Sequence, residues 1–236
     1  MATYVSLVNE LLRRLNEVTL DAGGDGFDTV RNVQALAKDA INSGVRAILQ
    51  DGQEWPFLKQ TYTQTLAAAT RQYSFPSDMG SVDWETFYIK KLSSQENTPR
   101  RLTPISYEDY TQNHRTSDDT GDLVNGDAAP TIVYQTFEDK FGVTPTPNAA
   151  YEVEYVYWSY PADMSVYNDV CIIPDRFKHV LIDGAMMYMM RFRSNEQSAM
   201  LHQQNFQEGI KSMRRLLLDD NLSLRSTVIA GIVGNG

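Results

Sequence analysis

The segment from Pro174 to Asp220 reads PDRFKHVLIDGAMMYMMRFRSNEQSAMLHQQNFQEGIKSMRRLLLDD and decides the fold, because it carries two apolar stripes at helical spacing. Pro174 suits the first turn of a helix, where its missing N–H costs nothing. The first stripe follows it and consists of Phe177, Val180, Leu181, Ala185 and Tyr188. Ser194 and Asn195 interrupt this stripe, and either residue is predicted to cap a second helix. The second stripe consists of Ala199, Phe206, Ile210, Met213 and Leu217. We therefore predict a helical hairpin that needs a further helical layer to cover its stripes.

Two amphipathic segments near the start of the chain are predicted to supply that layer. The first helix is expected over Val5–Val18, with the apolar stripe Val8, Leu11, Leu12, Leu15 and Val18. The second is expected to be capped by Asp28 and to end at Gly52, with the stripe Val30, Val33, Ala37, Ile41, Val45 and Ile48. Gly44 in this helix and Gly184 in the hairpin are predicted to lie at close helix crossings, because glycine has no Cβ to separate two backbones.

The apolar pattern changes from helical spacing to alternation between residues 57 and 171. Phe57–Leu66 alternates, and 67–70 is predicted to turn the chain into Gln72–Pro76 as a hairpin. Further strands are predicted at 82–91 and 151–160, and a second hairpin is predicted from 131–137 and 141–144. A short helix is expected from Ser106, with Asp109 as a capping-box-like partner three residues later.

These patterns predict an α+β fold, in which an antiparallel bundle of four main helices carries an inserted antiparallel β domain and an extended C-terminal tail. The predicted divisions are 1–56 and 172–220 for the two halves of the helical domain, 57–171 for the β domain and 221–236 for the tail. The tail is apolar and rich in small residues, and it is too short for a domain. It is expected to be disordered or docked on a partner.

The charge of the chain is concentrated in its middle. The 236 residues carry a net charge of −9, and residues 61–171 contain seven Lys or Arg against sixteen Asp or Glu. An acidic surface disfavours tight binding of phosphate backbones, but it suits a surface that nucleic acid passes without sticking. No apolar run of about eighteen residues predicts a membrane helix. The start of the sequence lacks a basic signal-peptide region, so an intracellular origin is expected.

No catalytic, cofactor-binding or metal-binding site is predicted. The phosphate-binding pattern GxxxxGK, the zinc pattern HExxH and the hydrolase pattern GxSxG are all missing from the sequence. Asp21, Asp25 and Gly26 resemble part of a calcium-binding loop, but Asn32 stands where that loop requires a bidentate glutamate. A flexible connection between helices is the better interpretation of this stretch.

Three other features of possible chemical interest are interpreted as packing. Cys171 is the one cysteine, and in its apolar surroundings it is predicted to be a buried small hydrophobe. The methionine-rich stretch 185–190 is predicted to belong to the core, because methionine fills irregular gaps. The tyrosines of the last predicted strand are available to stack on bases or sugars, but packing of sheet faces and oligomer contacts is the favoured interpretation: Tyr151, Tyr155, Tyr157 and Tyr160.

Three short stretches stand at characteristic places in this order of elements: WPF at 55–57, YSFPSD at 73–78 and PDRF at 174–177. With the helix pair before them and an amphipathic helix and loose tail at the end, the layout of the whole chain resembles the head-to-tail adaptor of short-tailed bacteriophages, the tail tubular protein A type. The resemblance implies a structural virion protein of the head-to-tail junction, made in the host cytoplasm, without enzymatic activity, cofactor or membrane. It also implies a dodecameric ring between the portal protein and the tail nozzle protein, with tail fibres as a further partner. Double-stranded DNA would pass through this ring during ejection without sequence-specific binding.

The C-terminal tail is the predicted partner-binding site, since the resemblance implies that it docks on the portal. The residues assigned to this docking are Leu222, Leu224, Arg225, Val228, Ile229, Ile232 and Val233. Two other functions remain open at this point. One is a minor tail or fibre-binding structural protein, and the other, less favoured, is a glycan hydrolase that uses carboxylates of the acidic β domain.

Overall fold

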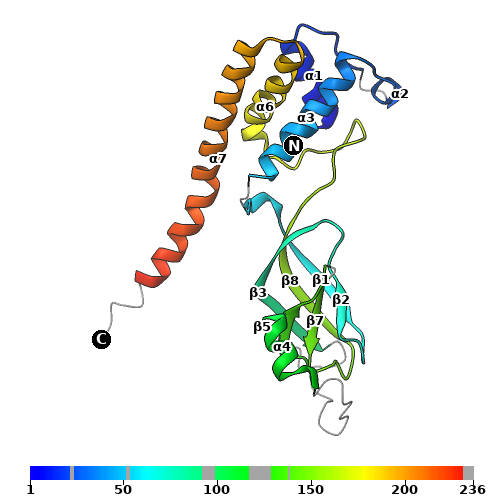
Figure 1. The fold of residues 1–236 in the computed structure, drawn as a ribbon, viewed down its shortest axis with the longest axis vertical. Helices are drawn as coiled ribbons and strands as arrows, with labels where there is room; N and C mark the ends of the chain where they lie inside the picture. Colours follow the sequence, from blue (N-terminus) through cyan, green and yellow to red (C-terminus); the bar gives the residue numbers. More distant parts are fainter. Residues whose placement is uncertain (22–23, 52–53, 92–98, 117–128, 138, 231–236) are drawn as a thin grey trace. The chain divides into compact units, whose positions relative to one another are not determined.

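The computed structural model describes residues 1–21, 24–51, 54–91, 99–116, 129–137 and 139–230, with the backbone alone considered at 24, 25 and 218–230. The chain forms two compact units (Figure 1): Met1–Leu58 together with Pro161–Gly236, and Lys59–Tyr160 between them. The first unit is helical and the second is built of strands, so the predicted α+β class and the insertion of a β segment into a helical unit are both seen. The segment 161–171, which was predicted to end the β domain, lies with the helical unit.

The helical unit is organised around one buried helix, α6 (Lys178–Phe192), which contacts three other helices. They are α1 (Tyr4–Arg14), α3 (Val33–Leu49) and α7 (Glu196–Ala230). The short helices of this unit are α2 (Gly24–Asp28), η1 (Pro56–Leu58) and η2 (Asp175–Phe177). Because α6 is covered from several sides, its apolar residues are buried almost all round, and Met186, Met187 and Met189 belong to the core as predicted. A complete four-helix bundle stays a prediction, because the extensive packing of α7 is with α6.

Glycines set the distances at which α6 meets its neighbours. A Cβ on Gly44 of α3 would lie 3.0 Å from Leu181 of α6, so α3 and α6 cross closely at this point. A Cβ on Gly184 of α6 would lie 2.8 Å from the ring of Phe206, and a Cβ on Gly209 of α7 would lie 2.7 Å from Val180. Phe206 of α7 thus fills the space beside Gly184 of α6, and Val180 of α6 fills the space beside Gly209 of α7. The predicted close crossings at Gly44 and Gly184 are confirmed.

The turn between α6 and α7 is closed by backbone hydrogen bonds. The N–H of Asn195 donates to the C=O of Met190 at 3.0 Å, and the N–H of Ser194 donates to the C=O of Arg191 at 3.0 Å. This is the Schellman arrangement, and Ser194 takes the left-handed position with φ of 55°. The side chain of Asn195 then accepts the N–H of Ser198 at 3.2 Å, so Asn195 is the residue that caps α7.

The β unit consists of two four-stranded sheets that pack face to face. One sheet has the order β1-β8-β3-β4 and the other β2-β7-β6-β5. Both sheets contribute to a single apolar core, for example through Phe87 and Tyr155 from the first and Phe141 and Val143 from the second. A short helix, α4 (Tyr107–Asn113), packs on β6 and is capped by Ser106 and Asp109 as predicted. The strands are β1 (Lys59–Leu66), β2 (Gln72–Ser74), β3 (Met79–Lys91), β4 (Arg100–Arg101), β5 (Thr103–Ile105), β6 (Ile132–Gln135), β7 (Lys140–Thr144) and β8 (Tyr151–Ser159).

Two predictions about the strands are wrong. β1 and β2 do not form a hairpin, because β1 pairs with β8 and β2 pairs with β7 in the other sheet. The β unit is also not wholly antiparallel, since β5 and β6 run parallel. The hairpin of β6 and β7 is confirmed. In each case the failure concerns the choice of a strand partner far away in the sequence, which local alternation does not encode.

The ends of two helices also differ from the predictions. α1 ends at Arg14, so Val18 is not part of the buried stripe and is 76% exposed. α7 continues to Ala230, so residues 221–230 are helical and not an extended tail. The sequence carries a signal for this longer helix, because no glycine or proline occurs between Gly209 and Gly231.

Replacing Gly184 with valine tests the crossing of α6 and α7. The new side chain would collide with the ring of Phe206, and such overpacking is expected to lower the free energy of unfolding by about 1–3 kcal/mol. Urea denaturation followed by helical circular dichroism measures the change. Gly26→Val is the matched control, because a Cβ at Gly26 meets nothing within 4 Å. Equal midpoints for the two variants would contradict the proposed tight crossing.

Candidate partner-binding site

The described residues offer little that resembles a reactive site. No group of three His, Cys, Asp or Glu among them is placed to hold a metal ion. Burial raises the pKa of the Cys171 thiol, so the group stays protonated and is a poor nucleophile, and its prediction as a buried small hydrophobe is confirmed. Burial also raises the pKa of Tyr4 and Tyr155. Of the four tyrosines considered for stacking, Tyr160 alone is exposed, and the other three pack inside the sandwich.

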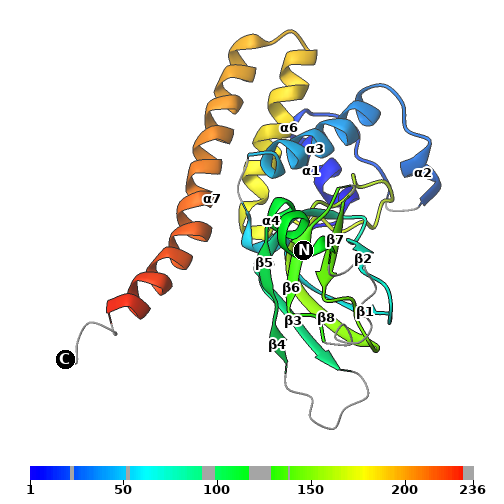
Figure 2. The same ribbon diagram turned by 60° about the horizontal axis from the view of Figure 1, so that its bottom comes forward.

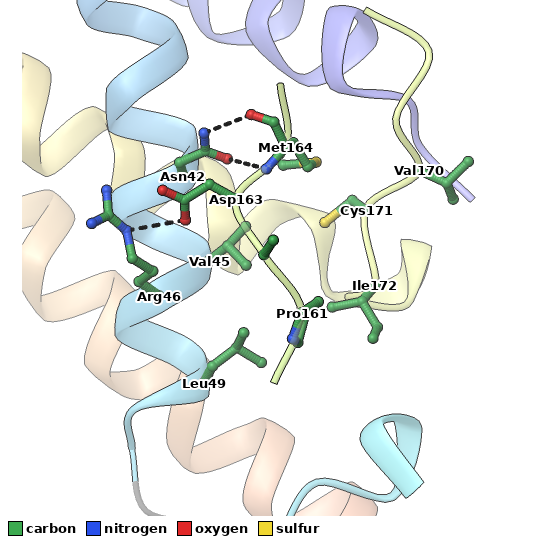
Figure 3. Close-up of a pocket in the computed structure, with 11 residues that line it drawn as sticks. Asn42, Val45, Arg46, Leu49, Pro161, Asp163, Met164, Val170, Cys171 and Ile172 are labelled. Carbon is green, nitrogen blue, oxygen red and sulfur yellow. Dashed lines mark hydrogen bonds and ion pairs between the residues drawn. The ribbon is translucent and has the colours of Figure 1, made fainter. Parts of the chain in front are cut away.

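The crevice around Cys171 lies between α3 and the segment 161–173, which returns the chain from the β unit (Figure 3). We call this segment the return segment. The crevice has a volume of about 40 Å³, which is far below the usual size of a small-molecule pocket. Figure 3 shows the side chains of Asn42 and Arg46 directed from α3 at the return segment. The crevice is therefore a joint between two parts of the helical unit.

An asparagine of α3 clamps the return segment in place. The side-chain N–H of Asn42 donates to the C=O of Met164 at 2.9 Å, and the side-chain oxygen accepts the N–H of Met164 at 3.2 Å. Asn42 also donates to the hydroxyl of Tyr4 at 3.2 Å, and that hydroxyl donates to the C=O of Lys38. Asn42 is buried, so its amide has little access to water that could replace these bonds. Asn9 of α1 holds the backbone of Leu20 with the same pair of hydrogen bonds.

The return segment also caps α1. Thr3 precedes this helix and makes no side-chain capping bond. Instead, the N–H of Tyr4 donates to the C=O of Asp169 at 2.8 Å, and the N–H of Val5 donates to the C=O of Tyr167 at 3.1 Å. These bonds satisfy two of the donors that every helix leaves unpaired at its start. The carboxylate of Asp169 in turn accepts the N–H groups of Val166 and Ser165, which lowers its pKa.

The residues predicted to bind a partner lie at the C-terminal end of α7 or beyond it. Leu222, Leu224, Arg225, Val228 and Ile229 belong to the last turns of this helix, whereas Ile232 and Val233 lie outside the described residues. α7 has 35 residues and is about 52 Å long, more than twice the length of α6. α7 runs antiparallel to α6, and both views show it continuing well past the N-terminal end of α6 (Figures 1 and 2). Among its described side chains, the last buried one is Met213, next to the ion pair of Arg214 with Asp51.

The sequence analysis missed a second surface, formed by exposed apolar side chains near the α6–α7 turn. Phe192 at the end of α6 is 62% exposed, and Met200 and Leu201 in the second turn of α7 are 71% and 58% exposed. Leu216 is exposed further along the same helix. Met200 and Leu201 lie off the apolar stripe of α7 that faces α6, and this position outside the stripe was the available signal. Exposed apolar groups gathered in one place are typical of a surface that contacts another protein.

Comparison with known protein families now bears on these surfaces. A protein family described as "SU10 adaptor protein" matches the chain over residues 2–229. The chain belongs to this adaptor family. Membership supports a structural adaptor of bacteriophage virions, and it suggests a role without catalysis. The match includes Leu222–Ile229 and ends before Ile232. No curated protein matches the chain.

Among the described residues, no helix of the adaptor is both long and apolar enough to cross a membrane. The partner-binding candidates of this adaptor are the C-terminal half of α7 and the exposed apolar side chains of Phe192, Met200 and Leu201 near the α6–α7 turn. Both depend on the helical unit, whose parts are joined by the Asn42 clamp.

Replacing Asn42 with alanine tests that clamp. The variant loses both bonds to Met164 and leaves the Tyr4 hydroxyl without its amide partner, so a loss of about 1–3 kcal/mol in the free energy of unfolding is expected. Chemical denaturation of the full chain measures it. Asn205→Ala is the control, because Asn205 is exposed on α7. A loss no larger than that of the control would show that the clamp does not stabilise the unit.

Proposed function

We propose that this protein is a head-to-tail adaptor of a short-tailed bacteriophage, which joins the portal to the tail nozzle as a ring around the DNA exit channel. The observation that carries the proposal is the length of α7. Within the region that matches the adaptor family, this helix extends far beyond the helix that covers it. An adaptor needs such a projecting element, because it must reach a partner while its own fold stays intact.

The C-terminal half of α7 is proposed to dock on the portal protein. The sequence from Leu222 onward is apolar and uncharged except for Arg225. A helix of this composition is typical of an element that binds in an apolar groove of another protein. The structure changes the earlier prediction in one respect, since the docking element begins as a helix and is not an extended tail.

The exposed apolar surface near the α6–α7 turn is proposed to contact the neighbouring copy in the ring. A ring requires a heterologous contact, in which one surface of a subunit meets a different surface of the next. Phe192, Met200 and Leu201 are exposed in the subunit alone, and burial in such a contact would remove their apolar area from water. The number of copies, twelve by the family resemblance stated above, is part of the proposal.

The charge of the chain supports a conduit rather than a binding site for DNA. Residues 61–171 contain sixteen acidic and seven basic side chains, and tight binding of the phosphate backbone needs an excess of basic ones. Double-stranded DNA would therefore pass the protein without being held.

Deleting residues 222–236 is expected to abolish portal binding and to leave the melting temperature unchanged. No described buried side chain is lost, since the last on α7 is Met213. Co-sedimentation with purified portal rings measures docking. A shorter deletion of 231–236 removes Ile232 and Val233 but keeps the helix through Ala230, and it should weaken docking less. Normal portal binding by the longer deletion would contradict the proposal. If the full-length protein bound the nozzle or fibre protein but not the portal, the alternative function as a minor tail protein would be favoured.

Replacing Leu201 with aspartate is expected to prevent ring assembly, because a charge would be buried without a partner in the contact between copies. The fold should be unaffected, since the side chain is 58% exposed. Negative-stain images and mass photometry, with and without portal, give the readout. Thr61→Asp is the control, because it introduces the same charge at an exposed position of β1, which is not part of the proposed contact. Rings of normal size from Leu201→Asp would remove this surface from the subunit contact.

A further inference from the structure

The β unit contains a groove that the proposed function does not use. It has a volume of about 700 Å³, which lies in the range of binding pockets. β5, the start of α4 and the turn after β6 line it, and these elements lie together at one end of the unit (Figure 2). Five of the nine lining side chains are aromatic or aliphatic, namely Trp84, Pro104, Ile105, Tyr107 and Phe137, and the other four are polar.

The aromatic walls of the groove are held rigidly from behind. Trp84 stacks on Phe87 with ring centroids 5.3 Å apart and meets the edge of Phe75. On the other wall, the rings of Tyr107 and Phe137 are 4.9 Å apart. Tyr107 is backed in turn by Tyr134 of the core. Trp84 and Tyr107 are fixed in this way and lose little entropy when a ligand binds, so these parts of the groove are preorganised.

Phe137 gives the clearest sign that this surface has a partner. Its side chain is 73% exposed, although it is large and wholly apolar. Trp84, Pro104, Ile105 and Tyr107 beside it are partly exposed. Phe137 thus stands among other partly exposed apolar side chains, and a group of such side chains is typical of a binding groove.

The charge of the groove is acidic. Asp109 is the charged residue among those that line it, and Glu108 is exposed beside it. No Lys or Arg is found among the described lining residues. A ligand that places a cation near the aromatic rings would gain both charge attraction and cation–π contact.

The backbone at the groove argues against binding by strand addition. β5 is the edge strand of its sheet, but it has three residues, and its central Pro104 has no N–H to donate. Recognition must therefore rest on side chains. Aromatic-lined grooves commonly bind extended proline-containing segments, which are already stiff and need no ladder of backbone hydrogen bonds.

We propose that this groove binds an extended segment of another protein that combines basic residues with proline and leucine. The walls bind its apolar residues, and the carboxylates at the rim bind its cations. The groove belongs to the β unit, so its occupant is distinct from the partner at the C-terminal half of α7. A failure of portal docking would leave this inference standing, and the reverse also holds.

Fluorescence anisotropy with three labelled peptides of about twelve residues tests the inference. One peptide repeats Arg-Pro-Pro-Leu, the second replaces each Arg with Glu, and the third repeats Arg-Gly-Ser-Gly. With the full chain at low salt, the first should bind at least about tenfold more tightly than either of the others, because only it supplies cations and rigid apolar groups together. Equal affinity for the Arg and Glu peptides, or no binding of the first, would overturn the proposal.

Two variants locate the binding. Phe137→Ser should weaken the first peptide about tenfold, and its exposed position makes misfolding no concern. The double variant Glu108→Gln, Asp109→Asn should weaken it and reduce its salt dependence. Tyr88→Ser is the control, since Tyr88 is an exposed aromatic that does not line the groove. Unchanged binding by Phe137→Ser, or preferential binding of a soluble glucan in the same groove, would refute the assignment.

Discussion

The reciprocal packing of α6 and α7 is the contact on which the helical unit depends. Phe206 fills the space that Gly184 leaves open, and Val180 fills the space at Gly209, so the two helices approach more closely than side chains at those positions would allow. Both glycines are needed, because a side chain at either Gly184 or Gly209 would push the two helices apart. The approach holds the first half of α7 firmly against α6 and leaves the second half to continue past it. A projecting helix can act as a docking element only when its base is rigid, and this contact provides the base.

The return segment joins the rest of the unit to that base. It leaves the β unit, crosses α3 at the Asn42 clamp and supplies the carbonyl groups that cap α1. The helical unit is thus closed by residues that lie more than a hundred positions apart in the chain, as the pair of Asn42 and Met164 illustrates. Such a closure keeps the helical unit continuous although a whole β unit is inserted into it. It also means that buried polar groups, and not apolar area alone, fix how the parts of the unit meet.

The two units present different kinds of surface. The helical unit offers exposed apolar side chains on its outer helix, together with a long projecting end. The β unit carries more acidic than basic side chains, and it contains an aromatic groove. This division suits an adaptor, since a protein that joins several partners needs surfaces of unlike chemistry to keep them apart. Family membership supports the adaptor role as such, whereas the identity of each partner rests on the surfaces.

The sequence by itself determined the elements and much of the helical core. Apolar stripes at helical spacing located α1, α3, α6 and α7, and Gly44 and Gly184 were recognised as crossing points because only glycine permits such an approach. Alternation located the main strands, since side chains of a half-buried strand point to opposite faces. The capping of α4 followed from Ser106 and Asp109 alone, because a cap is a local interaction. The partner-binding role of the C-terminal end stays a prediction, whereas its expected extended conformation was wrong, because residues 221–230 are helical.

The tertiary structure decided everything that depends on a distant partner. β1 looked like the first strand of a local hairpin, but it pairs with β8, and the choice lies in the burial of Tyr155 and its neighbours rather than in the turn. The groove brings together Trp84, Tyr107 and Phe137, and no pattern in the sequence indicates that these three residues lie close to one another. The capping of the start of α1 was equally hidden, because the carbonyl groups that accept its N–H groups lie on the return segment. Local periodicity records which face of an element is apolar, and only the folded chain records what covers that face.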